Sequence, residues 1–248
     1  MRNKALIVAL FLLFGQAGCS RKYKADQANA QGGGAATQTV EQRQSEARVY
    51  LEQGRELYRN DEDPKAAEAF QQAIKLDPEL AEAHFRLGLT YDALGQEKEA
   101  EDSYKKAVEA YKKFFASDEN SKDAEAHYNL GQTYAGLHVY SEAVREYRQA
   151  LRLKPDDAAI HYDLGTALMR LAQYDEAAGA FAKSFELDPE NYRAEDALAE
   201  AREGVQRIRT GKKHQEELLK KKKEEELKKE GEAGSSPEAK PASTRKPA

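Results

Sequence analysis

The feature that most constrains this chain is a pattern of residues that recurs four times along it. The copies align on Gly54, Gly88, Gly131 and Gly165, and they begin at Ala47, Ala81, Ala124 and Ala158. Successive copies are spaced by 34, 43 and 34 residues, so the middle interval contains nine inserted residues. Repeats of this length indicate that each copy is one supersecondary unit and that the fold is built by stacking these units.

Within each copy, apolar and small residues recur at the same positions. The third copy carries His127, Leu130, Gly131, Tyr134, Ala143, Tyr147 and Ala150. Apolar residues at i, i+3, i+4 and i+7 predict two amphipathic helices per copy. The Gly and Ala positions are small because the two helices must approach each other closely there. In three copies a proline, Pro78, Pro155 or Pro189, should end the second helix, since it disfavours helical geometry in the residue before it.

These recurring positions resemble the tetratricopeptide repeat (TPR), a helical hairpin of 34 residues. The resemblance implies an all-α fold, namely an α-solenoid of four TPR helical hairpins with a capping helix and a charged C-terminal helix. The four repeats are expected at residues 47–80, 81–114, 124–157 and 158–191. One hairpin cannot bury its own apolar face, whereas four stacked hairpins bury a continuous core.

The nine-residue insertion occupies residues 115–123, between the second and third copies. The apolar run through Tyr111, Phe114 and Phe115 predicts a longer second helix in copy two, followed by a polar loop at Ser117–Lys122. The insertion is either a tolerated extension of the hairpin or a site for a partner.

Residues 1–18 have the composition of a signal peptide, with Arg2 and Lys4 before an apolar run at Ala5–Gly15. This run is too short to cross a bilayer, which takes about 20 residues. The small residues before the single cysteine, Cys19, resemble the lipobox of bacterial lipoproteins, in which that cysteine receives a lipid. The alternative is a free thiol after an ordinary signal. Residues 19–46 are expected to form a lipid-anchored flexible tether, because they are largely polar and small.

Three further segments are predicted after the fourth copy. Residues 192–211 should form a capping helix that ends at Gly211. Residues 212–230 should form a charged helix, because several glutamates precede a lysine by four residues. Residues 231–248 contain three prolines among small polar residues and are expected to be disordered.

Catalytic, metal-binding and nucleic-acid-binding functions find little support in the sequence. The chain lacks the common nucleophile and zinc-protease motifs, and it carries a formal net charge of −5. His84, His127 and His161 share one register in successive copies, so they should stand roughly 10 Å apart and pack rather than bind a metal. The run Lys220–Lys223 is flanked by glutamates. We therefore expect no enzyme activity, no cofactor, no metal and no nucleic acid.

The resemblance to TPR proteins also implies a binding surface, the concave groove formed by the first helix of each copy. Its expected partner-binding residues are Leu51, Glu52, Arg55, Phe85, Arg86, Leu89, Tyr128, Asn129, Gln132, Tyr162, Asp163 and Thr166. A row of aromatic side chains edged by amides and charges suits an extended peptide or a helix.

The sequence therefore predicts a membrane-tethered scaffold or adaptor of the bacterial cell envelope, with an assembly or pilotin-like role. The chain should be exported and anchored by lipid, in the outer membrane and facing the periplasm. Its partners should be other envelope proteins. The alternative function is that of a periplasmic accessory protein, enzymatic or ligand-binding, which would use a small-molecule pocket in the solenoid.

Overall fold

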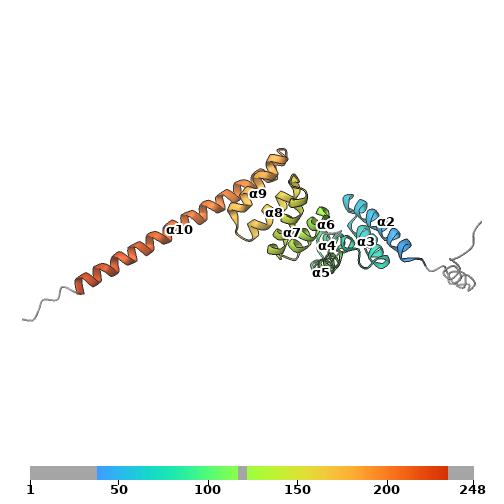
Figure 1. Ribbon diagram of the computed structural model, residues 1–248, viewed down its shortest axis with the longest axis horizontal. Coiled ribbons are helices and arrows are strands. Elements are labelled where there is room, and N and C mark those ends of the chain that lie inside the picture. The colour runs from blue at the N-terminus through green and yellow to red at the C-terminus, as the bar shows by residue number, and fades with distance from the viewer. Residues whose placement is uncertain (1–37, 117–121, 234–248) are drawn as a thin grey trace, which may run out of the picture. The chain divides into compact units, whose positions relative to one another are not determined.

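The computed structural model describes residues 38–116 and 122–233, and the regular elements in these ranges are α-helices (Figure 1). Pairs of helices joined by short turns follow one another along the chain. The pairs are α2 (Val40–Arg59) with α3 (Asp63–Leu76), α4 (Ala81–Ala93) with α5 (Glu97–Phe114), α6 (Ala124–Gly136) with α7 (Tyr140–Leu153), and α8 (Ala158–Arg170) with α9 (Tyr174–Leu187). The last described helix is α10 (Tyr192–Ala233). The predicted all-α solenoid of helical hairpins is confirmed.

Each hairpin is closed by an aromatic ring of the second helix that packs on the glycine of the first. The four contacts are Gly54 with Phe70, Gly88 with Tyr104, Gly131 with Tyr147, and Gly165 with Phe181. A Cβ atom added to any of these glycines would come within 2.5–2.7 Å of a ring atom. The glycine is therefore required because a ring occupies the space of its side chain, and this contact fixes how closely the two helices pack.

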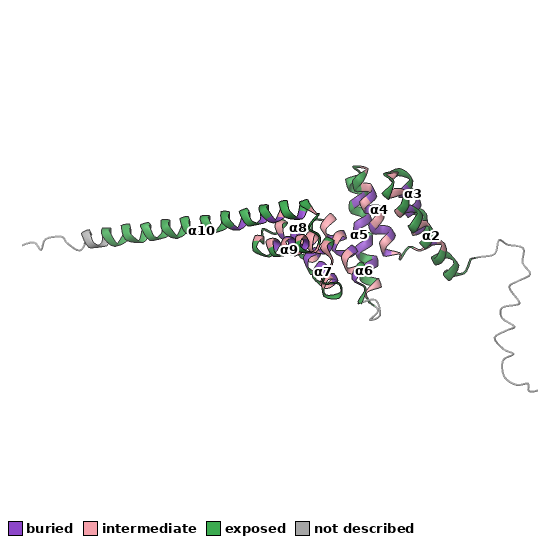
Figure 2. Cartoon of the chain, turned by 90° about the horizontal axis from the view of Figure 1, so that it is seen from above, coloured by how far each residue is buried: buried purple, intermediate pink, exposed green. Residues whose placement is uncertain are grey.

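Buried residues gather where successive helices face each other, and they form two hydrophobic clusters (Figure 2). The smaller cluster joins α2 and α3 to one side of α4, and the larger one runs from α4 to α10. Tyr104, Tyr147, Phe70, Phe85 and Phe181 are among the largest fully buried side chains. Both clusters include residues of α4, so this helix joins the first hairpin to the hairpins that follow it.

The insertion lengthens α5 as the sequence predicts. This helix has 18 residues, whereas α3, α7 and α9 each have 14. Most of the predicted loop at Ser117–Lys122 lies outside the described residues. The chain re-enters a helix at α6, where the Asp123 side chain accepts a hydrogen bond of 3.0 Å from the Ala126 amide and caps the helix.

The beginning of α2 differs from the sequence prediction, which placed residues 40–46 in a flexible tether. The helix already starts at Val40. Thr39 and Gln42 exchange two hydrogen bonds, of 2.9 and 3.2 Å, between the side chain of each residue and the backbone amide of the other. This reciprocal pair is a capping box, which pairs free amides at a helix start and so stabilises it there. The predicted signal peptide and Cys19 lie outside the described residues.

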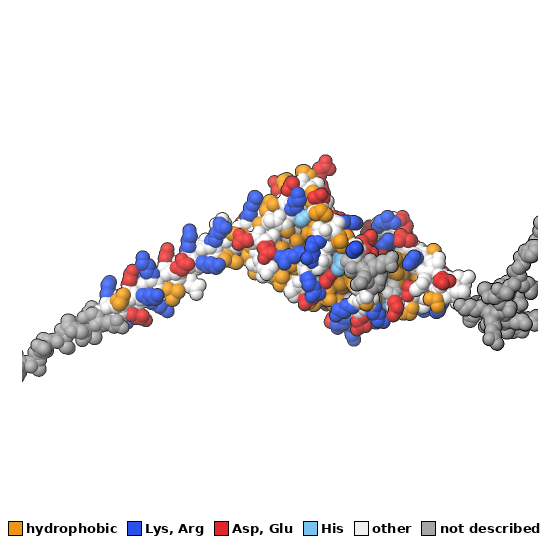
Figure 3. Space-filling model, viewed as in Figure 1, with side chains coloured by type: hydrophobic (Ala, Val, Ile, Leu, Met, Phe, Trp, Pro, Cys, Tyr) orange, Lys and Arg blue, Asp and Glu red, His pale blue; other side chains and the backbone are white. Residues whose placement is uncertain are grey.

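At the other end, α10 is a single helix through Gly211, so the predicted end of the capping helix at that residue is wrong. Gly211 does not have the positive φ angle of a helix-ending glycine, and two lysines, which are strong helix formers, follow it. Buried residues of α10 face α9, and beyond them the helix is exposed and covered with charged side chains (Figures 2 and 3). The expected Glu–Lys pairs of residues 216–229 do not come within 4 Å of each other. The helix also takes in residues 231–233, which were expected to be disordered.

Within the part of the chain that the structure describes, no helix combines the length and the apolarity that a membrane span requires.

Candidate partner-binding face

The first helices of the hairpins lie next to one another, and α10 continues their row. We call the surface carried by α2, α4, α6, α8 and α10 the first-helix face. All of the groove residues predicted from the sequence belong to the first four of these helices. The structure separates them into a polar cluster, an aromatic pair with a cation, an ion-pair network and a buried group.

The polar cluster links α6 to α8 through one carboxylate. Tyr128 donates a hydrogen bond of 2.8 Å to Asp163 Oδ2, and Gln132 Nε2 donates to the same oxygen at 3.1 Å. Gln132 Nε2 also lies 3.0 Å from the Tyr128 hydroxyl. Burial raises the pKa of Asp163, although both donors oppose that rise, and burial together with Asp163 raises the pKa of Tyr128. The cluster therefore holds the Tyr128 ring half-buried on this face.

The aromatic contact links α8 to α10. The Tyr162 ring is half-buried against Phe181, and the guanidinium of Arg193 lies 5.2 Å from its centroid. This is a cation–π distance. Thr166, one turn further along α8, is exposed. Tyr162 thus places a half-buried aromatic ring beside a positive charge on this face.

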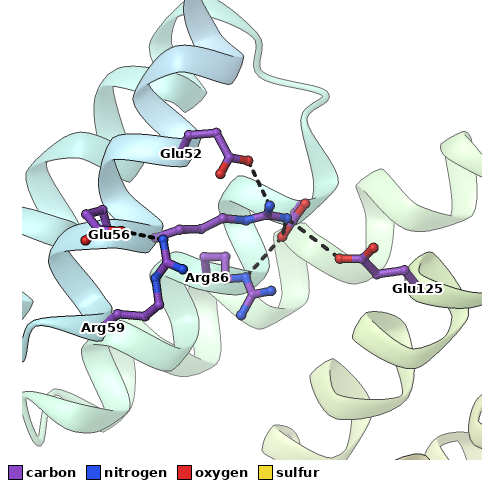
Figure 4. A network of polar contacts seen from close by, with 7 residues as sticks. Glu52, Glu56, Arg59, Arg86 and Glu125 are labelled. Carbon is purple, nitrogen blue, oxygen red and sulfur yellow. Dashed lines mark hydrogen bonds and ion pairs between the residues drawn. The ribbon is translucent and has the colours of Figure 1, made fainter. Parts of the chain in front are cut away.

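The ion-pair network joins α2, α4 and α6 (Figure 4). Arg55 pairs with Glu52 at 2.8 Å, with Glu82, and at 3.8 Å with Glu125. Glu82 also accepts a bond of 3.1 Å from Arg86 Nε. Burial alone would lower the pKa of Arg55, but the Glu82 hydrogen bond and the surrounding carboxylates raise it. The Arg55 guanidinium is therefore charged and tied to three carboxylates.

Three predicted groove residues are buried, which corrects the expectation that they face a partner. Phe85 is 0 % exposed, Leu51 is 5 % exposed and Asn129 is 4 % exposed. Phe85 shares its register with Tyr128 and Tyr162, but it has no hydroxyl that must reach a polar partner, and Arg86 lies over its ring at 5.3 Å. Leu89 is half-buried and packs against the larger core cluster.

A hollow of about 500 Å³ opens beside the ion-pair network, with walls from α2, α4, α5 and α6 and from the turns before α4 and α6. Its lining includes Arg55, Glu82, Tyr111, Glu125 and Asn129. Within the described residues, the only buried side-chain atoms without a hydrogen-bond partner are Arg55 Nε and the Tyr111 hydroxyl oxygen. Both belong to residues of this lining.

The histidines of the shared register make local contacts. Nε2 of His84 lies 3.0 Å from the Pro78 carbonyl oxygen, and Nε2 of His161 lies 2.8 Å from that of Pro155. His127 instead has Nδ1 2.8 Å from Glu146 Oε2. Among the described residues, no three His, Cys, Asp or Glu side chains are grouped so that they could hold a metal ion.

Comparison with protein families decides the identity of the fold. A family model described as TPR repeat matches residues 54–95 and 140–172, and models described as tetratricopeptide repeat match residues 81–114 and 158–191. This chain is a tetratricopeptide-repeat protein. TPR folds are in general non-enzymatic interaction scaffolds, and the repeats of this chain make it a scaffold for protein–protein interaction. A search of curated proteins found no match.

Solved structures of TPR proteins are similar to this chain. MamA is 25% identical and covers 79% of this chain and 98% of its own, with a TM-score of 0.47. PilF of Pseudomonas aeruginosa is 21% identical over 64% of this chain and 68% of its own, with a TM-score of 0.51. YrrB, a TPR protein with an unusual peptide-binding site, is 24% identical over 61% and 74%, with a TM-score of 0.45. The PilF comparison supports the fold alone.

Sequence reasoning missed several polar residues of the first-helix face in this TPR protein. Glu82, Glu125 and Arg193 each make a contact described above, and Arg48 lines the hollow. All four stand at the second position of a copy, counted from Ala47, Ala81, Ala124 or from Tyr192 of α10. The register of the repeat was therefore the signal that could have found them.

Proposed function

We propose that this TPR protein is a membrane-tethered adaptor of a bacterial cell envelope, with an assembly or pilotin-like role. Its first-helix face would form the groove that binds an extended or helical segment of a partner. The observation that carries this proposal is the half-buried pair Tyr128 and Tyr162, which stand beside Gln132, Asp163 and Arg193 on adjacent helices. Aromatic rings held in place by polar neighbours are typical anchors of protein interfaces.

The groove is tested by affinity purification from detergent-solubilised envelope with a tagged chain. Tyr162→Ala should weaken capture of the partner by about tenfold or more, as loss of an aromatic anchor does. Tyr140→Ala is the matched control, since Tyr140 is also half-buried but lies on the second helix α7. Equal loss of the partner in both variants, or in neither, would place the interaction on another surface.

The proposal of a membrane tether is supported by the sequence before the described residues, where a short apolar run precedes Cys19. Cys19→Ser should abolish incorporation of a labelled fatty acid and should move the chain from the membrane to the soluble fraction. Incorporation equal to that of the unchanged protein would rule out an anchor at Cys19.

A further inference from the structure

The hollow between copies one, two and three is a product of the insertion. The additional turn of α5 carries Tyr111, Lys113 and Phe114, and all three line the hollow. The hollow therefore lies where the spacing between copies is 43 residues instead of 34. A volume of about 500 Å³ falls within the range of ligand-binding pockets.

The lining combines apolar walls with an excess of acidic groups. Its apolar residues are Leu80, Ala81, Ala110, Phe114 and Ala126. Its charged residues are Asp77, Glu79, Glu82, Asp123 and Glu125, against Arg48, Arg55 and Lys113. Carboxylates outnumber cations by two, so the hollow favours a positively charged group over a negative one.

Pairing within the lining leaves one carboxylate weakly engaged. Lys113 pairs with Glu79 at 3.0 Å, and Arg55 pairs more closely with Glu52 and Glu82 than with Glu125. The Glu125 side chain is 60% exposed, and its one ion pair within the described residues is the 3.8 Å contact with Arg55 (Figure 4). Glu125 can therefore accept a further cation without losing a short hydrogen bond.

The Tyr111 hydroxyl is a second group that points to a ligand. Tyr111 is 3% exposed, and its hydroxyl lies near the Asn129 side chain but forms no hydrogen bond of good geometry within the described residues. A buried hydroxyl without a partner lowers stability, and such groups are rare in folded proteins. Its oxygen can accept a hydrogen bond from an ammonium group that enters the hollow.

We propose that this hollow binds a lysine side chain of a protein partner. The alkyl stem would pack on Ala110 and Phe114, while the ammonium group would reach Glu125 and the Tyr111 hydroxyl. This inference rests on the proposed function, since it gives the partner segment a defined chemistry. It concerns a different part of the first-helix face from Tyr128 and Tyr162.

The test is an NMR titration of the ¹⁵N-labelled chain with Nα-acetyl-lysine methylamide. We expect saturable shifts of the backbone amides of Ala81, Ala110 and Ala126. The neutral analogue Nα-acetyl-norleucine methylamide, which keeps the alkyl stem, should bind at least fivefold more weakly. The titration uses a small probe in place of the partner, so its result does not depend on the Tyr162 experiment. A negative titration likewise leaves the Tyr162 experiment unaffected.

Variants identify the groups that recognise the ammonium. Glu125→Gln should weaken binding of the lysine analogue at least threefold, whereas Glu101→Gln, which removes an exposed carboxylate elsewhere on α5, should not change it. Tyr111→Phe should weaken binding and leave the melting temperature equal or higher, because it removes only an unpaired hydroxyl. Absence of saturable shifts, equal binding of norleucine, or an unchanged affinity in Glu125→Gln would each overturn the proposal.

Discussion

Single residues in the left-handed region make the turn inside every hairpin. Asp61, Gly95, His138 and Ala172 have φ angles of 57°, 70°, 60° and 56°. They occupy one register of the four copies, and only the second copy uses glycine there. An L-residue pays a steric penalty in this region that glycine does not. The repeat therefore imposes the conformation, and three copies carry the resulting strain.

A reciprocal pair of substitutions tests this strain. Gly95→Ala should lower the free energy of unfolding, and Ala172→Gly should raise it, each by roughly 0.5–1 kcal/mol after the change in unfolded-state entropy is subtracted. A Cβ added at Gly95 would meet no atom within 4 Å, so its effect reports the backbone alone. Urea denaturation of both variants provides the measurement. Changes of the same sign would contradict the turn geometry.

The Asp163 carboxylate makes the stability of the protein depend on pH. Because burial raises its folded pKa above the unfolded value of about 3.9, the stability contributed by protonated Asp163 is fully present below the unfolded pKa. That stability is lost as the pH rises through the folded pKa. Asp163→Asn keeps an oxygen acceptor for Tyr128 and removes the titration. Its free energy of unfolding, relative to the unchanged protein, should therefore rise between pH 3 and pH 7.

Urea denaturation across this pH range measures the difference, and Asp156→Asn serves as the control because Asp156 is exposed. If both variants differ from the unchanged protein by a free energy of unfolding that does not vary with pH, burial does not shift the pKa of Asp163.

At the scale of the element, α10 is one helix with two environments. Ala194, Leu198, Ala201 and Val205 are buried, and a Cβ at Gly204 would come within 2.4 Å of the Tyr174 ring of α9. Beyond these residues the helix makes few contacts, and Leu218, Leu219 and Leu227 are exposed. Its second half is therefore held by helix propensity rather than by packing.

Gly211→Ala distinguishes a continuous helix from one that ends at this residue. Within an exposed helix, alanine is favoured over glycine by about 1 kcal/mol. We expect slower amide hydrogen exchange over residues 205–229, with no large change in the melting temperature. Lys213→Ala is the control, because lysine and alanine are both strong helix formers. Faster exchange in Gly211→Ala would mean that Gly211 ends a helix.

The sequence predicted the elements that the repeat register governs and missed those governed by local contacts. The paired helices and the small size of the glycine positions follow from recurring positions. The sequence attributed the glycines to a close approach of the two helices, and did not predict that an aromatic ring, such as Tyr147 on Gly131, occupies the space. The start of α2 depends on the Thr39–Gln42 capping box, which occurs once and outside the repeat. The burial of Phe85 could not be read from its register, since Tyr128 and Tyr162 at the same position are half-buried. The hollow at Tyr111 depends on how far α5 extends, which the repeat does not set.

For the whole molecule, stability should be a sum of hairpin stabilities and of the contacts between neighbouring hairpins. An end hairpin lacks one neighbour, and α10 fills that position for α9 at the C-terminal end. The apolar residues of α10 that face α9 are followed by an exposed, charged segment. Only the first half of α10 should therefore contribute to the stability of the core.

Two truncations test the division of α10. A chain that ends at residue 191 loses Leu198 and Val205 from the interface with α9, together with the two buried alanines. At about 1.5–3 kcal/mol for each buried Leu or Val, its free energy of unfolding should fall by roughly 3–6 kcal/mol. A chain that ends at residue 211 should match the full chain within about 0.5 kcal/mol, because exposed residues contribute little. Chemical denaturation followed by circular dichroism measures both. A large loss of unfolding free energy in the chain that ends at residue 211 would mean that the charged half of α10 packs on the solenoid. No loss in the chain that ends at residue 191 would mean that α9 needs no cap.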